Sequence, residues 1–255
     1  MKPVNPPVSS ADVSAVILPL ISTARSDEVE LRIRQAISLG LLRDGQQLPS
    51  EVALAAQMGV SPMTLREALA SLREQGLVET RRGRNGGTFV KRPTSPLANG
   101  LWSRLRHLSP TSLRDLADEH RAVWGTSARL AADRAAEDNV TRLFTLADVL
   151  LTAPNLGARI RADSRFHVDL AAASHSERLM RREVALQSEV GDLLWVPFEP
   201  DLEPVAVVAQ HRAIVDAIAR GDGPAARQLA EDHVSEDFRR LLALHHAAAH
   251  PRRKK

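Results

Sequence analysis

Apolar side chains first recur at helical spacing shortly after residue 25. Val29, Ile33 and Ile37 fall on one face of a helix for which Ser26 is a suitable N-cap. The preceding residues, 1–24, hold four prolines and several serines without such a period. We therefore expect an N-terminal arm that carries no regular structure, followed by a first helix.

Two further helices are predicted with a tight turn between them. The first extends from Ser50 to about Met58, and Gly59 supplies the turn. The second begins at Ser61 as N-cap, has a proline at its first helical position, and ends near Gly76. Three leucines at helical spacing form its buried stripe: Leu65, Leu69 and Leu72.

A short hairpin follows these helices. Residues 77–80 and 88–90 have the composition of two strands, and residues 83–87 form a glycine-rich turn between them. The stretch from 81 to 92 carries no acidic residue and five basic ones, Arg81, Arg82, Arg84, Lys91 and Arg92. Helix, turn, helix and hairpin together predict a winged helix-turn-helix, whose second helix can lie in a DNA major groove.

The rest of the chain has a helical pattern only. Prolines, serines, Asn99 and Gly100 indicate a linker at first, and helices of roughly 15–25 residues then alternate with short polar breaks. This favours an antiparallel all-α bundle, so that the fold class is mainly α. The expected parts are an arm (1–24), a winged helix-turn-helix (25–92), a linker (93–110), a helical bundle (111–246) and a disordered basic tail (247–255).

Composition narrows the class of protein. The 255 residues suffice for two modest domains, and the chain has no cysteine, which excludes disulfides and thiolate metal sites. The net charge of +3 is too small to indicate nucleic-acid binding by itself. The apolar segment at 13–21 is too short, and broken by Pro19, to span a membrane. We expect a cytoplasmic protein.

Candidate DNA contacts lie on the third helix and the hairpin. A helix N-terminus favours phosphate, and an arginine can bind guanine in a bidentate manner or grip a phosphate. Glycine in the hairpin lets the backbone approach the sugar-phosphate edge. The candidates are Ser61, Thr64, Arg66, Arg81, Arg82, Arg84 and Gly86. The alternative is a solvated basic hairpin beside a purely structural helical unit.

Four side chains in the second half could surround one metal ion. Asp163 and His167 are four residues apart and so project from one helical face, whereas His211 and His233 are separated by one helical hairpin. Three neutral imidazoles and a carboxylate suit Zn²⁺ and tolerate Ni²⁺, Mn²⁺ or Fe²⁺. A solvated histidine-rich surface is the alternative that spacing alone leaves open.

The N-terminal half resembles the DNA-binding domain of GntR-family bacterial repressors. The resemblance covers about residues 26–92 and rests on an ordered series of short motifs: Leu48-Pro49-Ser50-Glu51, Leu54-Ala55, Gly59-Val60-Ser61, Arg66-Glu67-Ala68-Leu69, Gly76-Leu77-Val78 and Gly86-Gly87-Thr88-Phe89-Val90. Pro62 and Val52 stand where the family often has arginine. The half-site sequence therefore does not follow from the resemblance.

The second half resembles the all-helical ligand-binding domain of the FadR branch of that family. This similarity covers about residues 111–246 and rests on three motifs: Leu113-Arg114-Asp115-Leu116 with Arg121, Asp163 to His167, and His211 with Gly221-Asp222 and His233. It implies that Asp163, His167, His211 and His233 bind a metal with open positions for a small carboxylate effector. It also implies that Arg121 faces this pocket and pairs with the carboxylate.

These observations predict a homodimeric transcriptional repressor that binds a pseudo-palindromic DNA operator and responds to a small organic acid. One alternative is a metal sensor without an organic ligand. Another is a metal-dependent hydrolase joined to a DNA-binding domain, because an open metal site could activate water. No recognisable motif places a general base near the four ligands, which disfavours the hydrolase.

Overall fold

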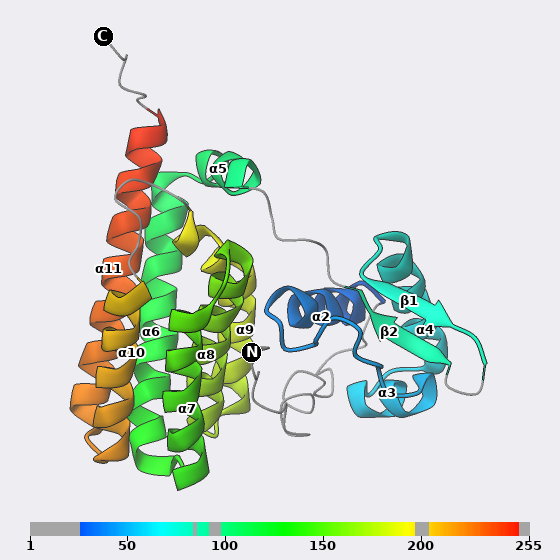
Figure 1. Cartoon of the computed structure of the whole chain (residues 1–255), viewed down its shortest axis with the longest axis horizontal. Coiled ribbons are helices and arrows are strands. Elements are labelled where there is room, and N and C mark those ends of the chain that lie inside the picture. Colours follow the sequence, from blue (N-terminus) through cyan, green and yellow to red (C-terminus); the bar gives the residue numbers. More distant parts are fainter. Residues whose placement is uncertain (1–25, 84–85, 92–97, 197–203, 250–255) are drawn as a thin grey trace. The chain divides into compact units, whose positions relative to one another are not determined.

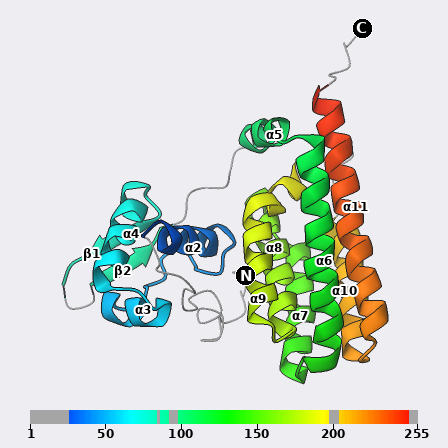
Figure 2. The ribbon, with the colours of Figure 1, turned by 180° about the vertical axis from the view of Figure 1, so that it is seen from behind.

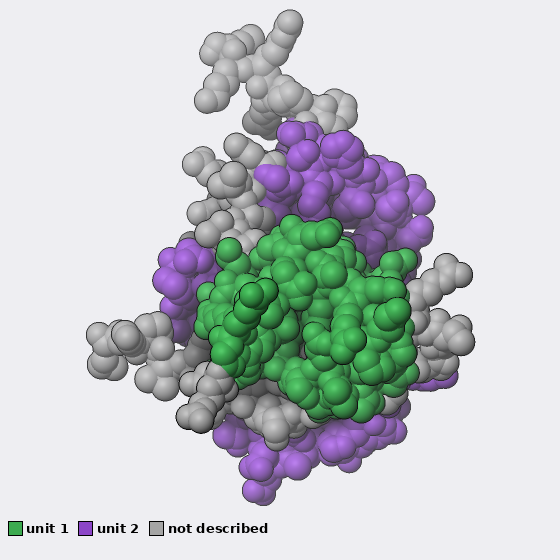
Figure 3. Space-filling model, turned by 90° about the vertical axis from the view of Figure 1, so that its right-hand side faces the viewer, with its two compact units in different colours: residues 1–94 green, residues 95–255 purple. Residues whose placement is uncertain are grey.

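The computed structural model describes residues 26–83, 86–91, 98–196 and 204–249. The chain divides into two compact units, residues 1–94 and 95–255, which Figure 3 shows in different colours. The first unit contains all the described strands, and the described residues of the second form helices joined by turns and loops. The predicted class, mainly α with a winged helix-turn-helix and a helical bundle, is confirmed.

The described residues of the first unit form three helices and a two-stranded antiparallel sheet. Its elements in order are α2 (Ser26–Ser38), α3 (Glu51–Met58), α4 (Pro62–Glu74), β1 (Val78–Arg81) and β2 (Gly87–Val90). The expected N-caps are observed, since the Ser50 hydroxyl accepts from the Ala53 amide and the Ser61 hydroxyl from the Thr64 amide. Gly59 ends α3 in the left-handed region at φ 67°, which makes the turn between the two helices.

The core of this unit comes from the faces that the apolar period predicts. α2 contributes Val29, Ile33 and Ile37, and α4 contributes the three predicted leucines, all of them buried. The strands pair with Val78 opposite Val90 and Arg81 opposite Gly87. The sheet packs against α4 through β1.

The second unit is a bundle in which long helices run beside one another. Its helices are α5 (Ala98–His107), α6 (Pro110–Arg134), α7 (Glu137–Val149), α8 (Leu156–Ala173), α9 (Glu177–Leu186), α10 (Pro204–Ala219) and α11 (Gly223–Ala249). A π-turn (Gln187–Gly191) and two short 3₁₀ turns (Leu150–Thr152 and Leu193–Trp195) complete it. α6 and α11 lie side by side in both ribbon views (Figures 1 and 2).

The predicted linker at 93–110 is wrong in part, because residues 98–107 form helix α5. Leu101 and Leu105, four residues apart, are buried in the same hydrophobic core as the long helices. Asn99 and Gly100 indicated a loop at the start of this segment. Burial of two leucines against the bundle outweighs those weak local preferences.

The structure describes part of the predicted C-terminal tail and none of the predicted N-terminal arm. α11 continues to Ala249, so that the tail predicted from residue 247 begins inside a helix. The predicted arm at 1–24 and the rest of the tail, 250–255, lie outside the described residues. No helix in the described ranges is long and apolar enough to cross a membrane.

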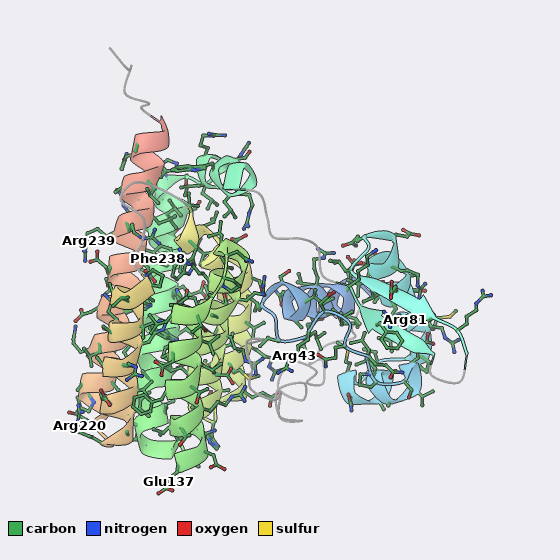
Figure 4. The ribbon with its side chains drawn as sticks, in the orientation of Figure 1. Arg43, Arg81, Glu137, Arg220, Phe238 and Arg239 are labelled. Atoms are coloured by element: carbon green, nitrogen blue, oxygen red, sulfur yellow. The ribbon has the colours of Figure 1, made fainter. Side chains whose placement is uncertain are left out.

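Neighbouring residues of α11 show how the bundle separates its interior from its surface. Phe238 is buried among the helices, whereas the next residue, Arg239, extends outward (Figure 4). The interior of the bundle also contains a set of polar and charged side chains. Side chains of this kind are rarely buried unless they have partners. These buried side chains are His120, Asp163, Ser164, His167, Glu183, Gln187, His211, His233 and Asp237.

Candidate functional site

The first predicted DNA contacts lie at the exposed start of α4. Ser61 and Thr64 hold each other through their hydroxyls, 2.9 Å apart, while Ser61 also caps the helix. Both residues therefore stabilise the helix start at the place where free backbone amides favour a phosphate. Their position agrees with the prediction that they contact DNA, and the contact itself stays a prediction.

Arg66 lies on the exposed face of α4 and is oriented by α3. Its Nε donates to Oε2 of Glu51 at 2.8 Å. A bidentate contact with guanine uses the two terminal nitrogens of an arginine, so that this ion pair and a base contact are compatible. The pairing connects the two helices of the DNA-binding motif through exposed side chains.

The wing presents basic groups in a defined arrangement. The Arg81 guanidinium lies 4.3 Å from the centre of the Phe89 ring and forms an ion pair of 2.7 Å with Glu79. Figure 4 shows Arg81 on the sheet. Arg82 is exposed beside it, and Arg84 lies outside the described residues.

Gly86 is required by the tight wing turn. A Cβ at this position would lie 2.5 Å from the Arg81 carbonyl oxygen, a contact that the backbone does not allow. The Gly86 carbonyl oxygen accepts from Nε2 of Gln47 at 3.0 Å, which ties the wing to the loop before α3. The glycine thus shapes the wing, and its contact with DNA stays a prediction.

The structure brings three of the four predicted metal ligands together in the bundle. His167 of α8, His211 of α10 and His233 of α11 each offer a ring nitrogen, and these atoms lie within 4.8 Å of one another. The Nε2 atoms of His167 and His233 are 3.3 Å apart. All three side chains are buried, so that the alternative of a solvated histidine-rich surface is wrong.

Asp163, the fourth predicted ligand, lies at the edge of this triad. Its Oδ1 is 3.5 Å from Nε2 of His211, and its Oδ2 accepts from Nε1 of Trp195 at 3.0 Å. Asp163 Oδ1 and both ring nitrogens of His211 are buried without a hydrogen-bond partner among the described residues. Burying a polar atom without a hydrogen-bond partner costs free energy of folding. A cation bound between Asp163 and His211 would offset this cost.

Burial keeps two of these histidines neutral. It lowers the pKa of His233 to about 3, with a smaller contribution from the charge of His120. Burial, together with the charges of His233 and His167, also moves the pKa of His211 well below its ordinary value. Both rings therefore keep a lone pair at neutral pH, which is the form that binds metals.

A second buried group adjoins the triad and was not predicted from the sequence. His120 of α6 contacts Glu183 of α9 (Nε2 to Oε1, 2.9 Å), and Gln187 donates to the same oxygen at 3.0 Å. The pKa of His120 is raised because the Glu183 carboxylate outweighs the opposing effect of burial. The pKa of Glu183 is lowered because His120 and the hydrogen bonds it receives outweigh burial. A buried ion pair results.

Glu183 also approaches the triad. Its Oε1 lies 3.5 Å from Nδ1 of His167, the ring nitrogen opposite the one that faces His233. A carboxylate in this place favours a proton on Nδ1 and so leaves Nε2 free for a metal. In the sequence, a glutamate in the middle of an amphipathic helix gave no signal of this role.

Arg121 does not join the cluster. It follows the buried His120 directly, and the helix turns it outward, where its side chain is 46 % exposed and its Nη1 lies 3.6 Å from Asp118. The side chains of α6 that face the cluster are His120 and Trp124. The expected approach of Arg121 to the metal ligands is not observed.

Comparison with known proteins agrees with both halves of this description. The model of the bacterial regulatory proteins of the gntR family matches residues 25–90, and the FCD domain matches residues 120–236. The RmpR protein of Mycobacterium gastri, named an HTH-type transcriptional regulator, is 40 % identical over 220 residues, covering 86 % of this chain and 80 % of that protein. The chain belongs to the GntR family. As an FCD-type GntR protein it is a transcription regulator and not an enzyme, which removes the hydrolase alternative.

A second relative and one solved structure are also similar to this chain. A protein of Escherichia coli (strain K12), named an L-lactate dehydrogenase operon regulatory protein, is 33 % identical over 230 residues, with 82 % of this chain and 83 % of that protein covered. The solved structure of E. coli McbR/YncC has a TM-score of 0.51 at 16 % identity, covering 87 % of this chain and 98 % of that one. The latter similarity shows that the two proteins share a fold.

Proposed function

We propose that this GntR regulator binds a pseudo-palindromic DNA operator as a homodimer, and that a divalent metal ion in its bundle helps to control the binding. The observation that carries the proposal is the buried triad of His167, His211 and His233 in the same chain as a winged helix-turn-helix. A regulator of this kind would act in the cytoplasm, where bacterial DNA lies.

The metal would be held by the triad and by Asp163. Two of the imidazoles are neutral, and unpartnered atoms of Asp163 and His211 face each other at 3.5 Å. Ligands from α8, α10 and α11 would then be tied to one ion, which stabilises one packing of these helices over others. Nitrogen and oxygen donors of this kind suit Zn²⁺, and also Ni²⁺, Mn²⁺ or Fe²⁺.

The proposed effector is a small organic acid. The relative from E. coli is named for the operon of L-lactate dehydrogenase, and lactate is a hydroxycarboxylate that can bind a metal through two oxygens. An effector of this kind changes operator affinity only if it binds one of two conformations more tightly. We infer a shift between states with DNA-competent and DNA-incompetent spacing of the two winged domains.

A metal sensor without an organic effector is the second candidate. The position of Arg121 favours it, because the arginine expected to hold the effector carboxylate lies at the surface beside Asp118. The buried base of α6, His120, is already paired with Glu183. Metal-dependent operator binding in the absence of any carboxylate would support this candidate over the first.

One experiment tests the metal and separates the two candidates. The DNA fragment upstream of the protein's own gene is titrated with metal-free protein, with protein loaded with Zn²⁺, Ni²⁺ or Mn²⁺, and with loaded protein plus L-lactate. We expect about one ion per chain by elemental analysis, and a change of DNA affinity on loading. His211→Ala should abolish both effects. Protein that carries no metal and is not stabilised by any of the three ions would disprove the metal site.

A further inference from the structure

Asp237 is a buried carboxylate beside the histidine triad that the proposed metal site does not yet include. It lies on α11 one helical turn after His233 and is only 8 % exposed. Its Oδ2 is 3.3 Å from Nε2 of His233. This is the same ring nitrogen that faces His167, so that three donor atoms from two helices meet here.

The hydrogen bonds of His233 indicate that a proton or a metal ion lies where these donor atoms meet. Nδ1 of His233 lies 2.7 Å from Oε1 of Gln210, an acceptor, so that the single proton of the neutral ring belongs on Nδ1. Nε2 then presents a lone pair to two other acceptors, Asp237 Oδ2 and His167 Nε2. Lone pairs that face one another in a buried space repel unless a proton or a metal ion lies between them.

Three pairs of neighbouring donor atoms have distances that fit the edges of a coordination shell. Donors bound to a metal at roughly 2.0–2.2 Å lie about 3.0–3.5 Å from their neighbours in octahedral or tetrahedral geometry. The pair of Asp237 and His233 is at 3.3 Å, the pair of His167 and His233 at 3.3 Å, and the pair of Asp163 and His211 at 3.5 Å. A carboxylate oxygen of Asp237 therefore lies about as far from the His233 ring nitrogen as a carboxylate oxygen of Asp163 lies from that of His211.

We propose that Asp237 is a further ligand of the metal ion, so that three imidazole nitrogens and two carboxylate oxygens hold it. This inference rests on the proposed metal site. Two carboxylates balance the charge of a divalent ion, and five protein donors exceed the four of a tetrahedral zinc site. The site then favours a five- or six-coordinate ion such as Ni²⁺, Mn²⁺ or Fe²⁺, and an octahedral ion keeps one position open for an effector atom.

Arg240 offers Asp237 an alternative partner. It lies three residues further along α11, and its Nε and Nη2 are buried without a hydrogen-bond partner among the described residues. The guanidinium interacts electrostatically with both Asp237 and Asp163. A role for Asp237 as a simple counter-ion of Arg240 is thus the competing explanation, and the coordination number of the metal distinguishes the two.

The experiment uses Co²⁺ as a spectroscopic probe in the full-length protein. Visible absorption of Co²⁺ is weak in five- or six-coordinate sites and several-fold stronger in four-coordinate ones. We expect weak bands in the wild type, and in Asp237→Ala stronger bands with an affinity for Co²⁺ lower by at least about tenfold. Asp237→Asn is measured in parallel in case the alanine variant does not fold, and circular dichroism of the metal-free proteins checks folding.

Glu236→Gln is the matched control, since it removes a carboxylate from the neighbouring, exposed position of the same helix. It should leave the spectrum and the affinity unchanged. If both Asp237 variants behave as the wild type while His233→Ala loses Co²⁺, Asp237 is the counter-ion of Arg240 and the inference is wrong, although the metal site stands. If the wild type itself binds no Co²⁺, both the inference and the proposed metal site fail.

Discussion

The indole of Trp124 stacks flat on the imidazole of His167, with ring centroids 3.9 Å apart and planes inclined by 8°. Trp124 Nε1 also donates to the carbonyl oxygen of His167 at 3.3 Å. A second stack, of Phe166 on His211, has the same centroid distance and an angle of 12°. Two of the three triad rings are thus fixed by aromatic neighbours before any ion binds.

Replacement of Trp124 should therefore affect stability and metal binding together. Trp124→Ala removes a fully buried side chain, and we expect a loss of about 3–5 kcal/mol in the free energy of unfolding. Metal affinity should fall as well, because His167 loses the ring that holds its orientation. Trp124→Phe keeps an aromatic face, so that its free energy of unfolding and its metal affinity should both fall less than those of Trp124→Ala. Chemical unfolding and metal titration measure the effects, and equal metal affinity in all three proteins would contradict the role given to the stack.

Arg66 is predicted to contribute directly to operator recognition. Arg66→Ala should weaken binding by roughly 1–3 kcal/mol and reduce sequence preference if the side chain contacts a base. Glu51→Ala should have a smaller effect in the same direction, because it removes only the ion pair that orients the guanidinium. Fluorescence anisotropy with operator and scrambled DNA measures both, and unchanged binding of Arg66→Ala would show that this arginine does not contact DNA.

Arg81 should contribute differently, through the phosphate backbone. Arg81→Ala is expected to weaken operator and scrambled DNA about equally and to lower the dependence of log affinity on log salt concentration by about one unit. Its stacking on Phe89 makes a loss of wing stability a competing cause. Arg81→Lys keeps the charge, and a wild-type salt dependence in this variant would confirm that charge is what matters.

The sequence predicted those parts of the molecule that depend on local signals. The caps at Ser50 and Ser61 and the turn at Gly59 follow from short-range chemistry, and the structure has them as expected. Helix α5 was missed because its stability comes from Leu101 and Leu105 packing on distant helices. Local propensity does not contain that information.

The residues of the buried site also differ in whether local sequence signals could predict them. Asp163 and His167 are related by one helical turn, so that a spacing of four residues sufficed to pair them. Asp237 follows His233 by the same four residues, so that spacing could have identified it as well. Glu183 belongs to the same buried cluster only because α9 packs near α8, which no spacing shows. The outward turn of Arg121 follows from a rotation of one residue on α6, which separates it from the buried His120.

The stability of the metal-free protein should depend on pH through His211 and His233. Because the pKa of His211 and of His233 is lower in the folded protein than the ordinary 6.5, the unfolded chain binds protons first as the pH falls. Their contribution is fully present above pH 6.5 and is lost as the pH drops toward the folded values, about 3 for His233. Burial raises the pKa of Asp163 and of Asp237. These two carboxyl groups therefore lower the stability of the protein as the pH rises above their ordinary pKa.

A comparison with His233→Gln isolates one of these groups. Between pH 6.5 and 5 the free energy of unfolding of the wild type should fall more steeply than that of the variant, by about 1.4 kcal/mol per pH unit. His120, whose pKa is raised, contributes a slope of opposite sign near pH 6.5, but it does so in both proteins and therefore cancels in the comparison. Urea unfolding in chelator at several pH values gives the slopes, and parallel slopes would show that His233 is not held neutral.

The Arg121→Ala variant tests whether Arg121 binds the effector, as the family resemblance implies, or is a surface residue, as its position in the structure indicates. The exposed guanidinium touches none of the triad, so that metal content should equal that of the wild type. The family resemblance predicts that the variant loses any effect of L-lactate on DNA affinity, whereas its position beside Asp118 predicts little change, and we expect the latter. Arg129→Ala, which removes another exposed arginine of α6 with an acidic partner one turn away, is the matched control. Calorimetric titration of metal-loaded protein with L-lactate compares them. A selective loss of binding in Arg121→Ala would mean that the side chain turns inward when the anion binds, and that the second anchor of the carboxylate is Arg121 after all.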